Sequence, residues 1–196
     1  MAGRKRVVIL NGPPSVGKDV QAARMAKLLN EQGIKAEVMQ VKEALYEATL
    51  EYYGLSDYYT EMFIDRVLKE RRSVTFGGLS PREALQHVSE KIYKPRYGND
   101  YFGKQSAQAV ENSHAEVIIF SDGGFKEEVE SISKVSDVSL IRVRKSGLDF
   151  TGDTRKYLYL DGIASMDYFI TEGNIVDDTL GLLAIFTELS EGTTHV

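Results

Sequence analysis

Short apolar runs alternate with longer amphipathic segments along this chain. Residues 7–10 read VVIL, and the stretch 21–32 has apolar positions at helical spacing and ends at Gly33. Residues 36–41 alternate in the manner of a strand, and residues 43–53 continue as a helix that stops at Gly54. Strands that alternate with amphipathic helices are typical of βαβ units, so the pattern predicts a parallel sheet.

The same alternation continues through the second half of the chain. The sequence SPRE at residues 80–83 predicts a capped helix start, with Ser80 as N-cap, and the helix should run to about residue 93. Further helices are expected at 102–112, 127–134 and 177–189, and further strands at 116–120, 139–143 and 168–171. We therefore predict one domain over residues 1–196, a three-layer α/β/α sandwich of the P-loop NTPase type with about five parallel strands.

One stretch departs from the strand and helix alternation. Residues 56–74 are rich in aromatic and charged side chains and contain no further strand pattern. We interpret this stretch as part of a helical insertion, at about residues 55–112, that covers a substrate. Charged side chains usually lie on a solvated surface, so Arg66 and the other cations of this region need further support before any of them is assigned a role.

Composition and charge exclude several classes of protein. The net charge of -5 argues against a general nucleic-acid surface, because phosphate backbones require basic patches. The absence of cysteine excludes disulfides, thiolate metal sites and a thiol nucleophile. No apolar run is long enough to cross a membrane and no secretory signal is evident, so we expect a cytoplasmic protein. The 11 tyrosines and 8 phenylalanines are as compatible with a homodimer interface as with base stacking.

A phosphate-binding motif follows the first apolar run. Residues 11–19 read NGPPSVGKD, which has the order G-x-x-x-x-G-K between a predicted strand and a predicted helix. The backbone amides of such a loop and its lysine bind the phosphates of a nucleoside triphosphate, here ATP. Most such loops continue with Ser or Thr as a Mg²⁺ ligand, whereas this chain has a carboxylate that can hold the ion directly or through water. The predicted ATP site comprises Gly12, Pro13, Ser15, Val16, Gly17, Lys18, Asp19 and Val20.

Two further segments carry groups suited to phosphoryl transfer. Asp122 follows the strand predicted at residues 116–120, two positions after its end, where a carboxylate can bind Mg²⁺ or orient the acceptor. The alternative is an ordinary turn aspartate before two glycines. Residues 142–156 read RVRKSGLDFTGDTRK, which predicts a basic lid at about residues 144–157. Arg144 and Arg155 would then lie near the transferred group. The alternative for this segment is an exposed connection with solvating charges.

In combination, these motifs resemble the phage deoxynucleoside monophosphate kinases, a family of P-loop nucleotide kinases. The resemblance follows nearly the whole chain in order and is carried by GKD in the loop, VKEAL, SPREALQHVSEKIYKPRYGNDYF and the strand that ends in SD. A loop ending in Lys-Asp is usual in that family. The resemblance implies an enzyme of the host cytoplasm if the source is a phage. It also implies an acceptor side formed by Lys42, Arg82, Gln86 and Arg96, with Tyr101 as an aromatic that stacks on the base.

Two departures from the family pattern lie near the acceptor side. Relatives often follow Ser-Asp with a hydrophobic residue and an arginine, whereas this chain has Gly123 and Gly124, so one expected cation is absent. Residues 89–91 read SEK where relatives tend to have Gly-Thr-Asp. The accepted base therefore stays open.

The leading hypothesis is an ATP- and Mg²⁺-dependent kinase that converts a deoxynucleoside 5'-monophosphate to the diphosphate. Lys18 would hold the β and γ phosphates, Asp19 and Asp122 would lie around Mg²⁺, and arginines of the insertion, with Arg66 among them, and of the lid would bind the acceptor. An acceptor phosphate is already anionic, so no strong general base is needed. One alternative is a P-loop kinase of a nucleoside, sugar or cofactor precursor, with Asp122 as base. Another is a nucleotide-binding switch, although no N-K-x-D motif is present.

Overall fold

A five-stranded parallel sheet forms the centre of the computed structural model, which describes residues 4–153 and 155–192. Its strands are β1 (Arg6–Asn11), β2 (Ala36–Met39), β3 (Val117–Phe120), β4 (Asp137–Arg144) and β5 (Ala164–Phe169). They lie in the order β2-β3-β1-β4-β5, and every neighbouring pair is parallel. The predicted α/β sandwich with a parallel sheet of five strands is confirmed.

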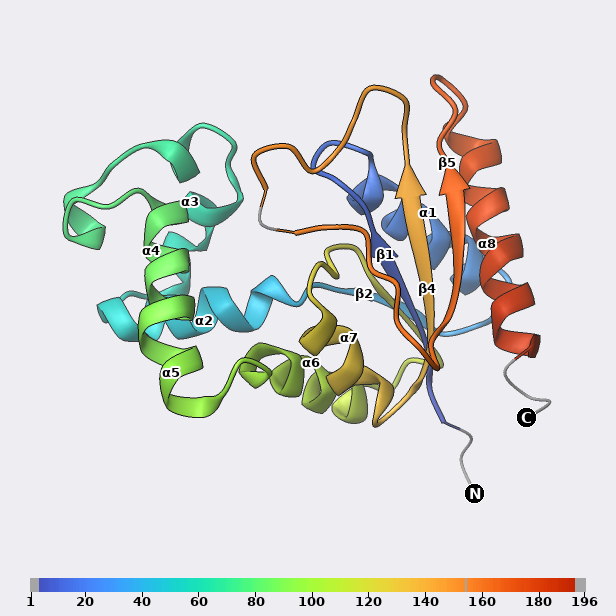
Figure 1. Ribbon diagram of the computed structural model, residues 1–196, viewed down its shortest axis with the longest axis horizontal. Coiled ribbons are helices and arrows are strands. Elements are labelled where there is room, and N and C mark those ends of the chain that lie inside the picture. The colour runs from blue at the N-terminus through green and yellow to red at the C-terminus, as the bar shows by residue number, and fades with distance from the viewer. Residues whose placement is uncertain (1–3, 154, 193–196) are drawn as a thin grey trace.

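Helices cover both faces of this sheet (Figure 1). Side chains alternate along β1, so Val7 and Ile9 pack on one face while Val8 and Leu10 pack on the other. The first face is covered by α6 (Tyr101–Asn112) and α7 (Lys126–Ser133), and the second by α1 (Lys18–Glu31) and α8 (Ile175–Gly192). Burial on both sides thus explains the continuous apolar run at residues 7–10 of β1.

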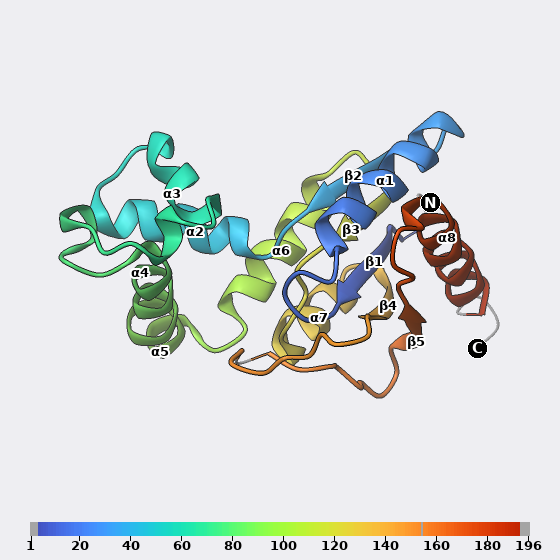
Figure 2. The ribbon, with the colours of Figure 1, turned by 90° about the horizontal axis from the view of Figure 1, so that it is seen from above.

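A separate lobe of helices extends from one end of the sheet layer, and α8 lies at the opposite end (Figure 2). Tyr46, Leu50, Phe63, Phe76 and Ala84 form the apolar core of this lobe. Its elements are α2 (Lys42–Tyr53), η1 (Asp57–Thr60), α3 (Glu61–Ile64), η2 (Leu68–Glu70), η3 (Val74–Phe76), α4 (Pro81–His87), η4 (Val88–Tyr93) and α5 (Lys94–Tyr97). Helix α6 falls within the predicted insertion at about residues 55–112 but packs on the sheet.

The helix that starts at Ser80 shows the predicted capping box and an unexpected π turn. Ser80 Oγ accepts a hydrogen bond from Glu83 N at 3.2 Å, and the Glu83 carboxylate accepts one from Ser80 N at 2.8 Å. The expected end at residue 93 was wrong, because α5 carries the helix on to residue 97 after the π-helical η4. Pro95 has no N–H and its ring would collide with the Lys91 carbonyl in a regular α-helix, which accounts for the widened turn before it.

The last strand lies earlier than the sequence pattern predicted. It spans Ala164–Phe169 rather than residues 168–171, and it forms one edge of the sheet. Ser165 and Asp167 interrupt its apolar pattern because both accept hydrogen bonds from Arg142 on the neighbouring β4. The connection between the two strands, residues 145–163, contains no helix or strand in its described part, and residue 154 of the predicted lid lies outside the described residues.

Candidate active site

The phosphate-binding motif forms the turn between β1 and α1, and both of its glycines are required by geometry. Gly17 is the N-cap of α1 with φ of 97°, a left-handed conformation that L side chains rarely adopt. A Cβ on Gly12 would lie 2.5 Å from the Val143 carbonyl oxygen on β4. A side chain at either position would therefore strain the loop or push it away from the sheet.

The first turn of α1 is left open toward an anion. No side chain caps this helix, and the bond from Gln21 N to Gly17 O, at 3.0 Å, is the first intrahelical backbone bond. The amides of Lys18, Asp19 and Val20 consequently have no intrahelical acceptor. Oriented N–H groups at the positive end of a helix attract phosphate oxygens.

Lys18 is folded onto its own loop. Its Nζ donates to the carbonyl oxygens of Gly12 at 2.7 Å and Pro13 at 2.8 Å, and the residue is only 9% exposed. Burial lowers the pKa of Lys18 to about 8, and repulsion from Arg155 adds to this effect although Asp19 opposes it. Phosphate oxygens that replaced the two carbonyls would stabilise the charged form of the lysine.

The two carboxylates that we predicted around Mg²⁺ have different surroundings. Asp19 Oδ1 accepts hydrogen bonds from Ser121 Oγ at 2.7 Å and Gln40 Nε2 at 3.4 Å, whereas its Oδ2 accepts none from the described residues. Asp122 accepts backbone hydrogen bonds from Val41 N at 2.8 Å and Lys42 N at 3.1 Å, one at each carboxylate oxygen. Burial raises the pKa of Asp122, against the attraction of Lys42.

These surroundings fit a magnesium ion that is held mainly by the nucleotide. Within residues 4–153 and 155–192, no three His, Asp or Glu side chains are grouped to hold a metal. Mg²⁺ commonly uses one or two carboxylates together with substrate phosphates and water. Asp19 suits direct ligation through Oδ2, while Asp122, with both oxygens bonded to the start of α2, suits contact through water. Both metal assignments stay predictions.

Asn11 is a functional candidate that sequence reasoning missed. The residue is 1% exposed, and its Nδ2 donates to Gly123 O at 3.1 Å and Lys156 O at 3.2 Å, while its Oδ1 accepts from Leu158 N at 3.0 Å. It therefore joins β1 to the turn after β3 and to the end of the predicted lid. A polar residue directly before the phosphate motif was the only available signal, and it did not reveal these distant partners.

The two predicted lid arginines are held in different ways. Arg155 donates from Nε at 2.9 Å and Nη2 at 2.6 Å to Asp153, and this hydrogen-bonded pair lowers the pKa of Asp153 to about 2. Arg144 donates from Nε to Asp167 at 2.8 Å and from Nη2 to the Tyr159 hydroxyl at 2.7 Å. Its guanidinium also lies 3.9 Å from the centroid of the Tyr157 ring. These contacts hold Arg144 at the β4–β5 edge, and its catalytic role stays a prediction.

Two of the predicted acceptor residues have electrostatic partners in the phosphate loop or the predicted lid. Lys42 contributes to the pKa shifts of both Lys18 and Asp122. Arg82 pairs with Glu70 at 2.7 Å, and this pairing raises the pKa of Arg82, to which Asp153 contributes more weakly. Lys42 therefore lies within electrostatic range of Lys18 and Asp122, and Arg82 within range of Asp153 in the predicted lid.

The structure does not bring the other acceptor residues to the loop. Arg66, Gln86 and Arg96 are exposed, and in the described part of the chain no hydrogen bond or ion pair joins them to residues 12–20. Arg96 lies with its guanidinium 5.2 Å from the centroid of the Tyr97 ring, on the short helix α5. Their roles in binding the acceptor stay predictions.

Tyr101 belongs to an aromatic cluster where the helical lobe joins the sheet layer. Its ring stacks on Tyr97 with centroids 5.0 Å apart, and it contacts Tyr93 at 5.2 Å and Phe102 at 5.1 Å. The cluster connects α5 to α6. Base stacking by Tyr101 stays a prediction, and this cluster would have to leave one face of its ring open.

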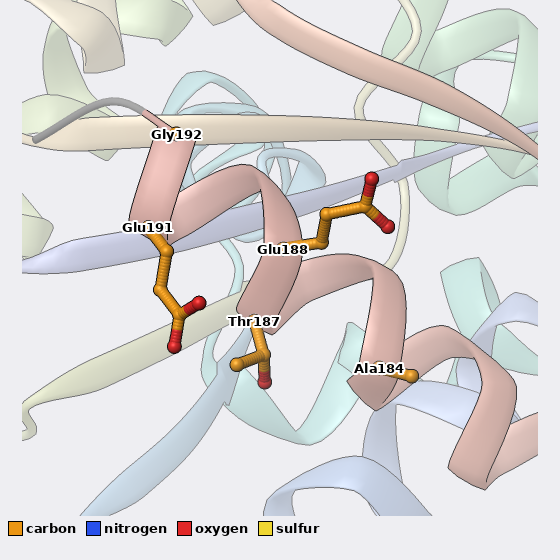
Figure 3. A pocket seen from close by; sticks show the side chains of 5 residues that line it. All are labelled: Ala184, Thr187, Glu188, Glu191 and Gly192. Atoms are coloured by element: carbon orange, nitrogen blue, oxygen red, sulfur yellow. The ribbon is translucent and has the colours of Figure 1, made fainter. Parts of the chain in front are cut away.

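Figure 3 shows a hollow elsewhere on the surface, on the outer side of α8. Ala184, Thr187, Glu188, Glu191 and Gly192 line it, and all five come from the C-terminal half of that helix. That half of α8 lies at the end of the sheet opposite the strand tips (Figure 1). A hollow with two acidic residues and no cation is not suited to bind a nucleotide phosphate.

Similarity to known proteins is confined to structure. No family model matches the chain, and no curated protein matches its sequence. The crystal structure of APE1195 aligns with a TM-score of 0.52 and 17% identity over 94% of this chain and 96% of that chain. At this identity the similarity concerns the fold. This chain has a parallel α/β sandwich fold, with the G-x-x-x-x-G-K loop between β1 and α1.

Two further structures align less well. One is the Mycobacterium tuberculosis APS kinase CysC in complex with AMPPNP and APS, with a TM-score of 0.49 and 11% identity over 94% of this chain and 98% of that chain. The other is a sugar kinase from Janibacter sp., with a TM-score of 0.49 and 10% identity over 95% and 98% of the two chains. No membrane-spanning helix accompanies the fold, since none in the described residues is sufficiently long and apolar.

Proposed function

We propose that this protein is an ATP- and Mg²⁺-dependent kinase that phosphorylates a deoxynucleoside 5'-monophosphate to the diphosphate. The observation that carries the proposal is the set of cations around Asp122. Lys18 comes from the phosphate loop, Lys42 from the start of α2 and Arg155 from the predicted lid, and all three interact electrostatically with this one carboxylate. Phosphoryl transfer depends on such charge neutralisation more than on covalent chemistry by the protein.

The loop geometry suggests how the donor would bind. The open amides of α1 would receive the β-phosphate, and Lys18 would move its hydrogen bonds from the Gly12 and Pro13 carbonyls to phosphate oxygens. Mg²⁺, when bound between the phosphates and Asp19, would neutralise part of the charge that develops during transfer. The protein would then have to hold the acceptor oxygen in line with the γ-phosphorus, which is a task for the helical lobe.

The surroundings of Asp122 favour an acceptor phosphate over an acceptor alcohol. An alcohol benefits from a carboxylate base within reach of its proton. Asp122 instead accepts hydrogen bonds from Val41 N and Lys42 N, one at each oxygen, and so binds the backbone amides at the N-terminus of α2. A phosphate acceptor is already ionised and needs cations, of which Lys42 and Arg82 are supplied by the lobe. A kinase of a nucleoside, sugar or cofactor precursor is therefore the weaker candidate.

The resemblance to the phage deoxynucleoside monophosphate kinases supports the specific acceptor. It implies that Lys42, Arg82, Gln86 and Arg96 help to form the monophosphate side and that Tyr101 stacks on the base. In its support, Lys42 interacts electrostatically with Asp122, and Arg82 interacts with Asp153 besides its ion pair with Glu70. The base itself stays open, because Gly123 and Gly124 and residues 89–91 depart from the family pattern close to the acceptor.

The test is ADP formation from Mg²⁺-ATP across a panel of deoxy- and ribonucleoside monophosphates, with the products separated by chromatography. We expect a diphosphate from at least one deoxynucleotide and saturation with its concentration. A Lys18→Met variant is the control for contaminating kinases and should lose turnover by at least about 100-fold. ATP left intact with every monophosphate, by protein that binds an ATP analogue, would reject the proposed acceptor class.

A further inference from the structure

The side chain of Arg155 lies across a glycine in the turn after β3. A Cβ built on Gly124 would be 2.3 Å from Arg155 Cδ and 2.8 Å from its Cγ. Gly124 does not have a positive φ, so its backbone conformation does not demand glycine. The missing side chain therefore matters for space: any larger residue here would displace the aliphatic part of Arg155.

The backbone on both sides of this glycine is fixed. Gly124 N donates to Glu128 Oε2 at 3.1 Å, and the neighbouring Gly123 carbonyl accepts from Asn11 Nδ2 at 3.1 Å. Asn11 Nδ2 also donates to the carbonyl of Lys156, the residue that follows Arg155. One buried amide thus holds both the turn under the arginine and the chain that carries it.

A short series of contacts through Asn11 connects the segment that carries Arg155 to the phosphate loop. Asn11 immediately precedes Gly12, whose carbonyl oxygen accepts the hydrogen bond from Lys18 Nζ. Arg155 is also the charged neighbour that contributes most to the lowered pKa of Lys18. Asp153 binds Nε and Nη2 of Arg155, but Nη1 donates to no group in the described residues. The guanidinium therefore keeps one nitrogen, Nη1, without a hydrogen-bond partner among the described residues.

We propose that Gly124 and Asn11 are positioning residues that seat Arg155 as a second cation, beside Lys18, for the triphosphate of ATP. Gly124 supplies the space for the side chain, and Asn11 fixes the two backbone segments. The inference rests on the proposed use of ATP but not on the identity of the acceptor. It also explains why position 124 is a glycine, because the side chain of Arg155, from the predicted lid, occupies the space that a larger residue would need.

The test is a double-mutant cycle on nucleotide binding. The affinity for Mg²⁺-AMPPNP is measured by calorimetry for the wild type, Gly124→Ala, Arg155→Met and the double variant. Gly124→Ala should weaken binding about tenfold, and Arg155→Met should weaken it at least as much. In the Arg155→Met background, Gly124→Ala should cause no more than about a twofold further loss, because its target is already absent.

Two controls separate this effect from general damage. Lys156→Met removes a neighbouring exposed cation and should change the affinity less than about twofold if bulk charge is unimportant. Thermal unfolding shows whether each variant is folded. If Gly124→Ala does not fold, Arg155→Lys replaces it as the test of the proposed role of the Arg155 guanidinium. Arg155→Lys should bind the analogue at least about fivefold more weakly, because lysine lacks the donor fork.

The outcomes are distinct. Wild-type affinity in Gly124→Ala, or equal losses from this change in both backgrounds, would overturn the inference. If Gly124→Ala does not fold, wild-type affinity in Arg155→Lys would overturn it. Because AMPPNP binding needs no acceptor, a cycle that behaves as expected together with no monophosphate consumed would reject the proposed kinase function alone.

Discussion

The buried charge of Lys18 makes a quantitative prediction for the pH dependence of nucleotide binding. In the free protein, burial and Arg155 lower the pKa of Lys18 to about 8. With triphosphate bound, opposite charge should return this pKa toward the ordinary range, above 10. At a pH between these two pKa values, Lys18 is mostly deprotonated in the free protein but protonated in the complex. Binding must then include protonation of Lys18, so the affinity should fall as the pH rises.

The size of the fall follows from the fraction of free protein that carries the proton. With a pKa of about 8, this fraction is about one half at about pH 8 and about 3% at about pH 9.5. The dissociation constant for Mg²⁺-AMPPNP should therefore rise about 15-fold over that interval, which corresponds to about 1.6 kcal/mol. Calorimetry at closely spaced pH values measures this directly.

A matched variant identifies the group responsible. Lys18→Arg keeps a positive charge throughout this range, because arginine does not deprotonate in proteins. Its affinity for Mg²⁺-AMPPNP should be nearly constant from about pH 8 to about pH 9.5, whatever its absolute value. Flat binding in the wild type, or the same slope in both proteins, would refute the reasoning from the lowered pKa.

Three other changes have defined outcomes. Arg155→Met should move the break in the wild-type pH profile upward, because it removes a cation that lowers the pKa of Lys18; an unchanged break would show that burial acts alone. Asn11→Ala should lower the free energy of unfolding in urea by about 2–4 kcal/mol, since three hydrogen bonds are lost and buried groups remain unpaired; a loss below about 0.5 kcal/mol would contradict this. Asp19→Asn should raise the Mg²⁺ concentration for half-maximal activity at least about fivefold, and an unchanged requirement in a Mg²⁺ titration would argue against direct ligation.

The local parts of this site could be predicted from sequence because their causes are local. A run of buried residues, two glycines and a lysine specify the turn between β1 and α1 within a dozen positions. The capping box at Ser80 is likewise set by residues three apart. The order of strands and helices followed for the same reason, since each element has its own apolar period.

The interactions between distant segments could not be read from the chain. Asn11 bonds to residues more than 100 positions away, and nothing in the pattern around it specifies these partners. Arg142 and Arg144 belong to a predicted basic segment, yet Asp167 on β5 holds both of them at the sheet edge. The polar partners of these arginines, Ser165 and Asp167, interrupt the apolar pattern of β5, and its bounds were therefore predicted incorrectly.

The predicted absence of a cation after Ser121-Asp122 illustrates the same limit. The resemblance implied an arginine near this position, where the chain has Gly124. In three dimensions, the side chain of Arg155 covers this glycine. This contact between residues 124 and 155 becomes visible only in the folded chain. Double-mutant cycles are the appropriate measurement for such pairs, because single variants do not separate the two contributions.

The most direct test of the central claim follows the γ-phosphate of ATP. Protein, Mg²⁺ and ATP labelled in the γ-phosphate are incubated with each deoxynucleoside monophosphate in turn, and the label is located by chromatography. The account predicts labelled deoxynucleoside diphosphate with the wild type and a loss of at least about 100-fold with Lys18→Met. Label found only in free phosphate, at a rate independent of every monophosphate, would contradict it.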